Sequence, residues 1–356
     1  MANNWDKLLS DVLVEIAKRI RMPEDFVAFR GVCTSWRSAA TKDNFMFRNC
    51  PVPLLMLVPK KDSHVLEFYN LTKGIVNQVS LSEPLMGKRF IYSSKGCLIT
   101  IDQGLNVNLM HPFSNLQHKF PNMMTFNNGR LLITKCALSS NPLLYPDYIL
   151  MVIYDGRRLI YARPGDETWT MFSQHKYGTY CDITHYEGRI YAVSCSGEIW
   201  AYKIGGVDNP SEEELVAKLL IKLPPYHPAQ TYIVESAKAF LIIVKYIHYD
   251  AENGYEVYRS SEFVVFNLDS STRTCTEIKD LGDRMIFLGH NSTFLSAHLP
   301  NCKPNSIYFT DNCKEGYDES ARIYGLQDGS ITFTSHISHK SFDLITPPMW
   351  IEESSI

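Results

Sequence analysis

The sequence predicts a small all-α N-terminal domain of three helices, followed by an all-β domain that is best described as a six- or seven-bladed β-propeller. Three observations lead to this fold class. Apolar side chains recur at helical spacing near the N-terminus. Farther along, short runs rich in valine, isoleucine, tyrosine and phenylalanine alternate with turn-forming residues. Several of these runs follow a glycine, in a weak internal repeat. We assign the helices to residues 4–45 and the β domain to residues 54–350.

The first helix is predicted to begin at Ser10 and Asp11, because both residue types are favoured at helix N-termini. The apolar residues that follow the i, i+3, i+4, i+7 spacing of one helix face are Leu9, Val12, Leu13, Ile16 and Ile20. Val14 and Ala17 fall outside this stripe. The helix is therefore predicted to be amphipathic.

Two further short helices are predicted. One opens at Pro23, since proline is tolerated in the first turn of a helix, and the other covers residues 35–41 and carries Trp36. A segment of this size rarely shelters a core of its own without a disulfide, a metal or a partner. It contains neither paired cysteines nor a cluster of metal ligands. We therefore expect a partner protein to cover its apolar surface.

Residues 8–16 (LLSDVLVEI) and 25–37 (DFVAFRGVCTSWR) resemble the F-box. That family's pattern is Leu-Pro, an acidic residue, two aliphatic residues and an isoleucine, then Arg-x-Val-Cys-x-x-Trp-Arg. The resemblance implies docking on a Skp-family adaptor, which links the chain to a cullin in an SCF-type ubiquitin ligase. Leu9 stands where the family has proline, a departure that bears on the affinity of the contact.

Carried over by position, the resemblance implies nine adaptor-binding residues: Leu8, Leu9, Val12, Leu13, Ile16, Phe29, Val32, Cys33 and Trp36. Helices that bury apolar faces against another protein form obligate, apolar interfaces, which agrees with this assignment. The alternative is that these helices pack on the following domain of the same chain.

The β domain is predicted from its strand-like runs, which lie at residues 54–58, 65–69, 97–101, 131–134, 149–154, 190–194, 199–204, 239–247, 263–268, 307–310 and 331–334. The only helix-like interruption is 211–218, which is either a short helix or a polar excursion between strands. Two glycine-led runs after Gly188 and Gly197 predict a β-hairpin. Repeated hairpins favour a propeller of six or seven blades, with a large sandwich or two smaller β domains as alternatives.

A second resemblance favours the propeller. The strings at 161–169 (YARPGDETW), 281–291 (LGDRMIFLGHN), 305–311 (NSIYFTD) and 347–350 (PPMW) are similar to the KIB-type kelch-like β-propeller domain of plant F-box proteins. The resemblance spans most of residues 60–350 and implies a domain that recognises a target protein.

Composition argues against several other classes. The formal net charge is −3, so no global field attracts nucleic acid or anionic membranes. The apolar runs are shorter than the ~20 residues that span a bilayer. Nine scattered cysteines without a C-x-x-C pair predict reduced thiols in a protein of the nucleus and/or cytoplasm.

No enzyme motif is present, and we expect no catalytic residue, metal or cofactor. A glycosidase acid and base could come from Asp155, Asp166, Glu167 and Asp182, but aspartates usually collect in turns, and we assign these residues there. The sequence therefore predicts a substrate receptor that binds the Skp adaptor, through it a cullin, and an unknown protein substrate. The alternative is a non-catalytic scaffold that binds the adaptor outside a ligase.

Overall fold

A computed structural model describes residues 8–19, 29–40, 52–57, 64–81, 88–114, 116–126, 132–174, 178–203, 212–219, 230–236, 239–252, 255–269, 272–289, 293–296, 299–310, 321–333 and 348–353. By its internal contacts the chain divides into two compact units. The first contains residues 1–52 and 353–356, and the second contains residues 53–352. We refer to the first as the N-terminal lobe and to the second as the propeller.

The N-terminal lobe contains the helices α1 (Ser10–Arg19) and α3 (Thr34–Ala39), with a helical turn at residues 29–31 between them. Helix α1 begins at the predicted residue, and α3 starts one residue before the predicted range. The predicted opening of the second helix at Pro23 lies outside the described residues, as does Ile20. Cys33 has an extended backbone with φ −163°, which separates the helical turn from α3.

The core of the lobe is small. Its buried apolar residues are Leu13, Ala17, Phe29, Ala39 and Ala40. Ala17, which the spacing argument placed outside the apolar stripe, is fully buried, whereas Leu9 from that stripe is exposed. Ala17 of α1 packs in the same buried cluster as Ala39 and Ala40, so small side chains occupy the interior of the lobe. Three of the five core residues are alanines, so this core buries little apolar area.

Replacing Leu13 by alanine tests how much of the lobe depends on this core. Deleting a buried leucine costs about 2–5 kcal/mol, which is comparable to the whole stability of a small domain. We expect residues 8–19 and 29–40 to lose protection from hydrogen exchange in the full chain, while the propeller keeps its melting temperature. Val12→Ala is the matched control, because Val12 is 42% exposed and should change stability by less than about 0.5 kcal/mol. Equal exchange in both variants would contradict the assigned core.

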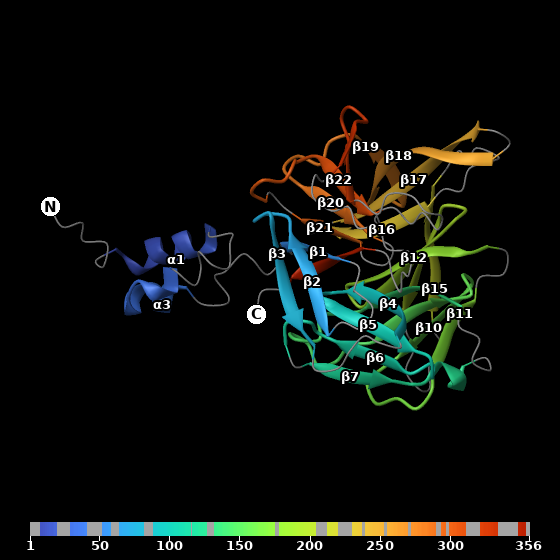
Figure 1. Ribbon diagram of the computed structural model, residues 1–356, viewed down its shortest axis with the longest axis horizontal. Coiled ribbons are helices and arrows are strands. Elements are labelled where there is room, and N and C mark those ends of the chain that lie inside the picture. Colours follow the sequence, from blue (N-terminus) through green and yellow to red (C-terminus); the bar gives the residue numbers. More distant parts are fainter. Residues whose placement is uncertain are drawn as a thin grey trace. The chain divides into compact units, whose positions relative to one another are not determined.

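The propeller consists of six β-sheets (Figure 1). The first contains β1 (Val52–Met56), β2 (Val65–Asn70), β3 (Ile75–Ser80) and β25 (Met349–Glu353). The second contains β4 (Lys88–Ser94), β5 (Cys97–Asp102), β6 (Val107–Met110) and β7 (Gln117–Phe120), followed by a short 3-10 helix, η3 (Met123–Thr125). The third contains β8 (Ile133–Leu138), β9 (Leu150–Tyr154), β10 (Arg158–Ala162) and β11 (Thr170–Gln174).

The remaining three sheets continue this order along the chain. The fourth contains β12 (Tyr180–Tyr186), β13 (Arg189–Ser194), β14 (Glu198–Lys203) and β15 (Glu212–Lys218). The fifth contains β16 (Gln230–Ser236), β17 (Ala239–Glu252), β18 (Tyr255–Asp269) and β19 (Thr274–Ile278). The sixth contains β20 (Met285–Leu288), β21 (Thr293–Ser296), β22 (Ser306–Thr310), β23 (Ala321–Gly325) and β24 (Ile331–Phe333).

The six sheets confirm the predicted β-propeller and set the number of blades at six. Five blades have four strands each, and the sixth has five, in the order β21-β20-β22-β23-β24. The pairing of β20 with β22 is parallel, whereas the other pairings recorded between described strands are antiparallel. In the fifth blade, β17 and β18 continue past their neighbours as a two-stranded ribbon, visible in Figure 1.

Several strands are continuous apolar runs in the sequence, because both faces of each blade pack against neighbouring blades. All five residues of β9 are buried. Leu150, Val152 and Tyr154 belong to the core between the second and third blades, and Met151 and Ile153 to the core between the third and fourth. Because side chains alternate along a strand, each blade buries both of its faces against its two neighbours. A sheet with only one buried face would alternate between apolar and polar residues.

The ring is closed by the C-terminal strand. β25 pairs with β1, so the first blade combines strands from both ends of the propeller. Trp350 of β25 enters the core shared with the sixth blade, and Met349 and Ile351 enter the core shared with the second. The described residues therefore form an apolar core at each of the six junctions between neighbouring blades.

Two local predictions in the fourth blade have different outcomes. The predicted hairpin is confirmed, because β13 and β14 pair antiparallel across a turn in which Gly197 has φ +83°. The helical interpretation of residues 211–218 is wrong, since β15 is the outer strand beside β14. One of its three successive glutamates, Glu214, is contacted by cations from another strand and from a turn. Arg189 lies 2.9 Å from Glu214, and Arg273 contacts the same carboxylate.

The prediction that the cysteines are reduced thiols is wrong for one pair. Cys181 and Cys195 form a disulfide, and Cys33, Cys97, Cys136, Cys275 and Cys302 are free thiols. Cys50 and Cys313 lie outside the described residues. No spacing motif predicts this bond, because the two cysteines lie in a strand and in a neighbouring turn, 14 residues apart.

Candidate functional site

The N-terminal lobe has an apolar surface that its own core does not cover. Leu9 directly precedes α1, and its spacing of three and four residues from Val12 and Ile16 brings the three side chains to the same side of the helix. Leu9 is 75% exposed, Val12 is 42% exposed, and Ile16 is half-buried. Val32, after the helical turn at 29–31, is 54% exposed. We call Leu9, Val12 and Val32 the exposed apolar set, whereas Ile16 packs against the core of the lobe.

The nine residues predicted to bind an adaptor differ in their burial. Leu9, Val12 and Val32 are exposed, and Leu8, Ile16, Cys33 and Trp36 are half-buried. Leu13 and Phe29 are buried in the core of the lobe. This core supports the exposed positions, because Leu13 adjoins Val12 in α1 and Phe29 precedes Val32 in the following turn.

Polar and aromatic contacts hold the turn that carries Val32. The Trp36 and Phe29 ring centroids are 4.4 Å apart, so the indole of α3 packs on the preceding helical turn. Arg30 Nη1 donates to the carbonyl oxygen of Ala40 at 3.0 Å, and Arg37 Nε donates to that of Arg30 at 3.3 Å. These contacts connect the start and the end of the segment at residues 29–40. These contacts fix the turn that carries the exposed side chain of Val32.

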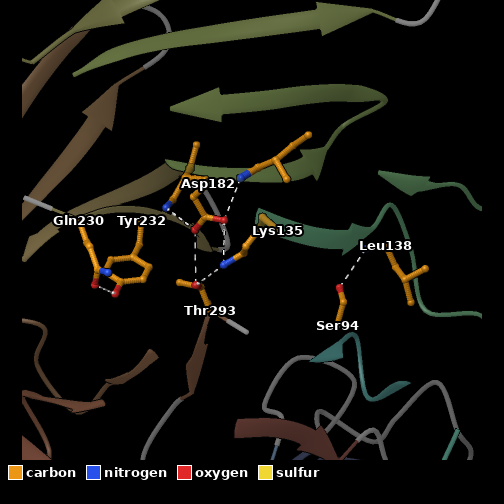
Figure 2. A network of polar contacts seen from close by, with 9 residues as sticks. Ser94, Lys135, Leu138, Asp182, Gln230, Tyr232 and Thr293 are labelled. Atoms are coloured by element: carbon orange, nitrogen blue, oxygen red, sulfur yellow. Dashed lines mark hydrogen bonds and ion pairs between the residues drawn. The ribbon is translucent and has the colours of Figure 1, made fainter. Parts of the chain in front are cut away.

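The axis of the propeller holds a polar network made by four blades (Figure 2). Lys135 Nζ of β8 lies 3.0 Å from Asp182 Oδ1 of β12, and the two side chains are only 5% and 2% exposed. Thr293 of β21 lies 3.4 Å from both side chains. The backbone N–H of Ile233 in β16 donates to Asp182 Oδ2 at 3.1 Å. We call Lys135, Asp182, Ile233 and Thr293 the axial network.

Asp182 therefore lies in a strand, and the prediction that it occupies a turn is wrong. Its carboxylate also accepts the N–H of Ile183 at 2.8 Å, so both of its oxygens are engaged. Asp155 and Asp166 do occupy turns, where Asp155 pairs with Arg158 and Asp166 accepts the N–H of Arg163 at 2.7 Å. A carboxylate held by an ammonium, a hydroxyl and two amides is suited to a structural role, because such partners stabilise its charged form.

Further hydrogen bonds extend the polar contacts around the axis. Ser93 Oγ of β4 donates to the carbonyl oxygen of Trp350 in β25 at 2.9 Å. Ser94 Oγ accepts the N–H of Leu138 in β8 at 3.0 Å, as drawn in Figure 2. Together with the axial network, these bonds connect the innermost strands of all six blades. The sheets are thus held together by polar contacts at the axis as well as by the apolar cores between them.

A second charged group lies at the ends of inner strands. Lys95 Nζ, in the turn after β4, is 3.3 Å from Glu235 Oε2 of β16. Burial acts to lower the pKa of Lys95, but Glu352 and Glu235 together hold this pKa above its usual value. Burial raises the pKa of Glu352, and it lowers the pKa of His185 in β12. The two acidic side chains thus favour the charged form of Lys95, which burial alone would disfavour.

Sequence reasoning missed both charged groups, because their members come from blades far apart in the chain. Asp182 and Thr293, for example, are separated by 111 residues. Lys135 carried one usable signal, since it is the one charged residue of a strand whose other residues are apolar apart from Thr134. His336 and His339 lie outside the described residues. Among the residues described here, no group of three or more His, Cys, Asp or Glu side chains could hold a metal ion, and no helix is long and apolar enough to cross a membrane.

The chain thus combines an N-terminal helical lobe that exposes apolar side chains with a six-bladed propeller that follows it in the sequence. The model of the KIB1-4 beta-propeller family matches residues 68–331, and the chain belongs to this family. It is a plant F-box protein with a propeller domain, as its relatives indicate.

Three Arabidopsis thaliana relatives are similar over nearly the whole chain. F-box protein SKIP23 is 23% identical over 98% of this chain and 95% of its own length. F-box protein At4g35733 is 23% identical over 98% of this chain and 99% of its own length. Putative F-box protein At3g25750 is 25% identical over 95% of both chains. The relatives therefore share the lobe as well as the propeller.

Proposed function

We propose that this chain is the substrate-recognition subunit of an SCF-type ubiquitin ligase. Its lobe binds a Skp-family adaptor, and through it a cullin, while its propeller binds a target protein. The observation that carries the proposal is the exposure of Leu9, Val12 and Val32 in a lobe whose core is mostly alanine. Apolar surface that a small domain leaves exposed is characteristic of a protein interface. The F-box names of the relatives support the same partner.

In this proposal the chain supplies proximity and no reacting group. Holding a target lysine close to a ubiquitin-conjugating enzyme raises the rate of transfer, because a bimolecular encounter becomes effectively intramolecular. The engagement of both Asp182 oxygens supports a non-catalytic role for the buried carboxylate at the axis. We further propose that the protein acts in the nucleus and/or the cytoplasm.

Val12→Asp and Val32→Asp test the adaptor contact in the full-length protein. We expect each to weaken binding to a purified Skp-family adaptor by at least about tenfold, because a carboxylate would be desolvated in an apolar interface. Val12 lies in the first turn of α1, where aspartate is compatible with the helix dipole, so the lobe should stay folded. Calorimetric titration of the adaptor with each variant gives the affinity.

Ile75→Asp is the matched control, since Ile75 is a half-exposed residue of β3 in the propeller and should leave adaptor binding unchanged. Undiminished binding by both lobe variants would rule out the exposed apolar set as the adaptor contact. Assembly with purified cullin then separates the two functions. A chain that binds the adaptor but never enters a cullin complex would be a scaffold outside a ligase.

A further inference from the structure

The disulfide between Cys181 and Cys195 connects a strand of the fourth blade to a nearby turn. Cys181 lies in β12, and Cys195 lies in the turn between β13 and β14, with the two Cα atoms 5.6 Å apart. The N–H of Cys195 also donates to the carbonyl oxygen of Thr179 at 2.8 Å. Both cysteines are only half-buried, so small reagents can reach them from solvent.

Cys181 is the extra residue of a β-bulge. Tyr180 pairs with Ser194 and Asp182 pairs with Val193, which leaves Cys181 without a partner in β13. A bulge changes the direction of the side chains that follow it. The next side chain is that of Asp182, which belongs to the axial network. The disulfide therefore fixes the residue whose placement directs Asp182 to the axis.

We propose that Cys181 and Cys195 form a reversible oxidation site, and that their disulfide stabilises the bulge that holds Asp182 in the axial network. The oxidant that we propose is a peroxide, of which hydrogen peroxide is the simplest. One thiol loses its proton, and the thiolate attacks a peroxide oxygen, so the O–O bond breaks and a sulfenic acid and hydroxide form. The hydroxide takes up the proton that the thiol released and leaves as water. The second thiol attacks that sulfur, the S–O bond breaks, and a second water leaves. A dithiol reductant reverses the bond by thiol–disulfide exchange and becomes a disulfide itself.

The other described cysteines are poorly suited to this reaction. Cys97, Cys136 and Cys302 are buried, and burial raises the pKa of Cys97 to about 12 and that of Cys302 to about 11. Thiolate is the reactive form, so these residues stay unreactive. Cys275 is half-buried and free, and burial raises the pKa of its thiol. It is therefore the matched comparison for the pair.

Peptide mapping of the full-length protein tests the pair. After mild peroxide treatment and alkylation, we expect a peptide pair linked through Cys181 and Cys195, with Cys275 alkylated. After a dithiol reductant, all three should be alkylated. Oxidised wild type should also melt about 5 °C higher than reduced wild type, and Cys195→Ser should abolish this difference while Cys275→Ser keeps it. Alkylation of Cys181 and Cys195 after peroxide would overturn the proposal.

Hydrogen exchange tests the connection to Asp182. The N–H groups of Ile183 and Ile233 both donate to this carboxylate, so they report on its position. We expect them to exchange about tenfold faster in the reduced protein, and in Cys195→Ser under either condition. The N–H of Leu98 in β5, in the second blade, serves as the internal reference. Equal exchange in both redox states would show that the bond does not stabilise the axial network.

Discussion

Replacing Asp182 by alanine is expected to destabilise the propeller by about 3–5 kcal/mol, because it leaves the buried ammonium of Lys135 without its counter-ion. The N–H groups of Ile183 and Ile233 lose their acceptor in the same step. Denaturant unfolding of the full chain, followed by tryptophan fluorescence, measures the change. Asp182 contacts residues of three other blades, so its removal weakens the junctions of four blades at once. We therefore expect the propeller to unfold in one cooperative transition at a lower denaturant concentration.

Two further variants separate the charge from the hydrogen bonds. Asp182→Asn keeps an oxygen that can accept an amide but removes the charge, and we expect it to cost less than Asp182→Ala. The double variant Lys135→Met/Asp182→Ala should be more stable than Asp182→Ala alone, since no unpaired ammonium remains. If Asp182→Ala unfolds within about 1 kcal/mol of wild type, the axial network contributes little.

Most strands could be predicted because turn chemistry is local. The glycines at 188 and 197 both have positive φ, a conformation that glycine adopts without strain, and each precedes a strand. The strand β15 was harder to predict. Three successive glutamates resemble a helix start, yet they lie in an outer strand, where Arg189 and Arg273 both contact Glu214.

The number of blades could not be read from length. The ribbon formed by β17 and β18 uses many residues without adding a blade, so dividing the domain by a typical repeat leaves six and seven equally possible. The continuous burial of β9 was the better indicator of architecture. A run such as residues 149–154 is apolar on both faces, as radial packing of blades requires and a two-layer sandwich with a solvated face does not.

In the lobe, the sequence was a poor guide to which apolar residues are buried. Its helical spacing was readable, but spacing alone does not tell which apolar residues face the core. The large residues Leu9 and Val12 were grouped with Leu13, yet only Leu13 is buried. Ala17 takes the interior position because neighbouring helices approach closely there. The large residues that remain outside are those available to a partner.

Trp350→Ala is expected to destabilise the propeller by about 3–5 kcal/mol and to loosen the junction that closes the ring. Trp350 is fully buried, and its ring lies 5.1 Å from Phe287 and 6.3 Å from Tyr308, both of the sixth blade. It is carried by β25, which completes the first blade. We expect lower denaturant midpoints, together with faster hydrogen exchange in β1 and β25.

Two controls distinguish ring closure from the loss of any large side chain. Trp169→Ala removes another buried tryptophan, at the junction of the second and third blades, and should lower stability while leaving exchange in β1 and β25 unchanged. Trp350→Phe keeps an aromatic ring and deletes an indole N–H that has no hydrogen-bond partner among the described residues, so it should cost less than about 1.5 kcal/mol. If Trp169→Ala accelerates exchange in β25 as much as Trp350→Ala does, then closure is not the specific role of Trp350.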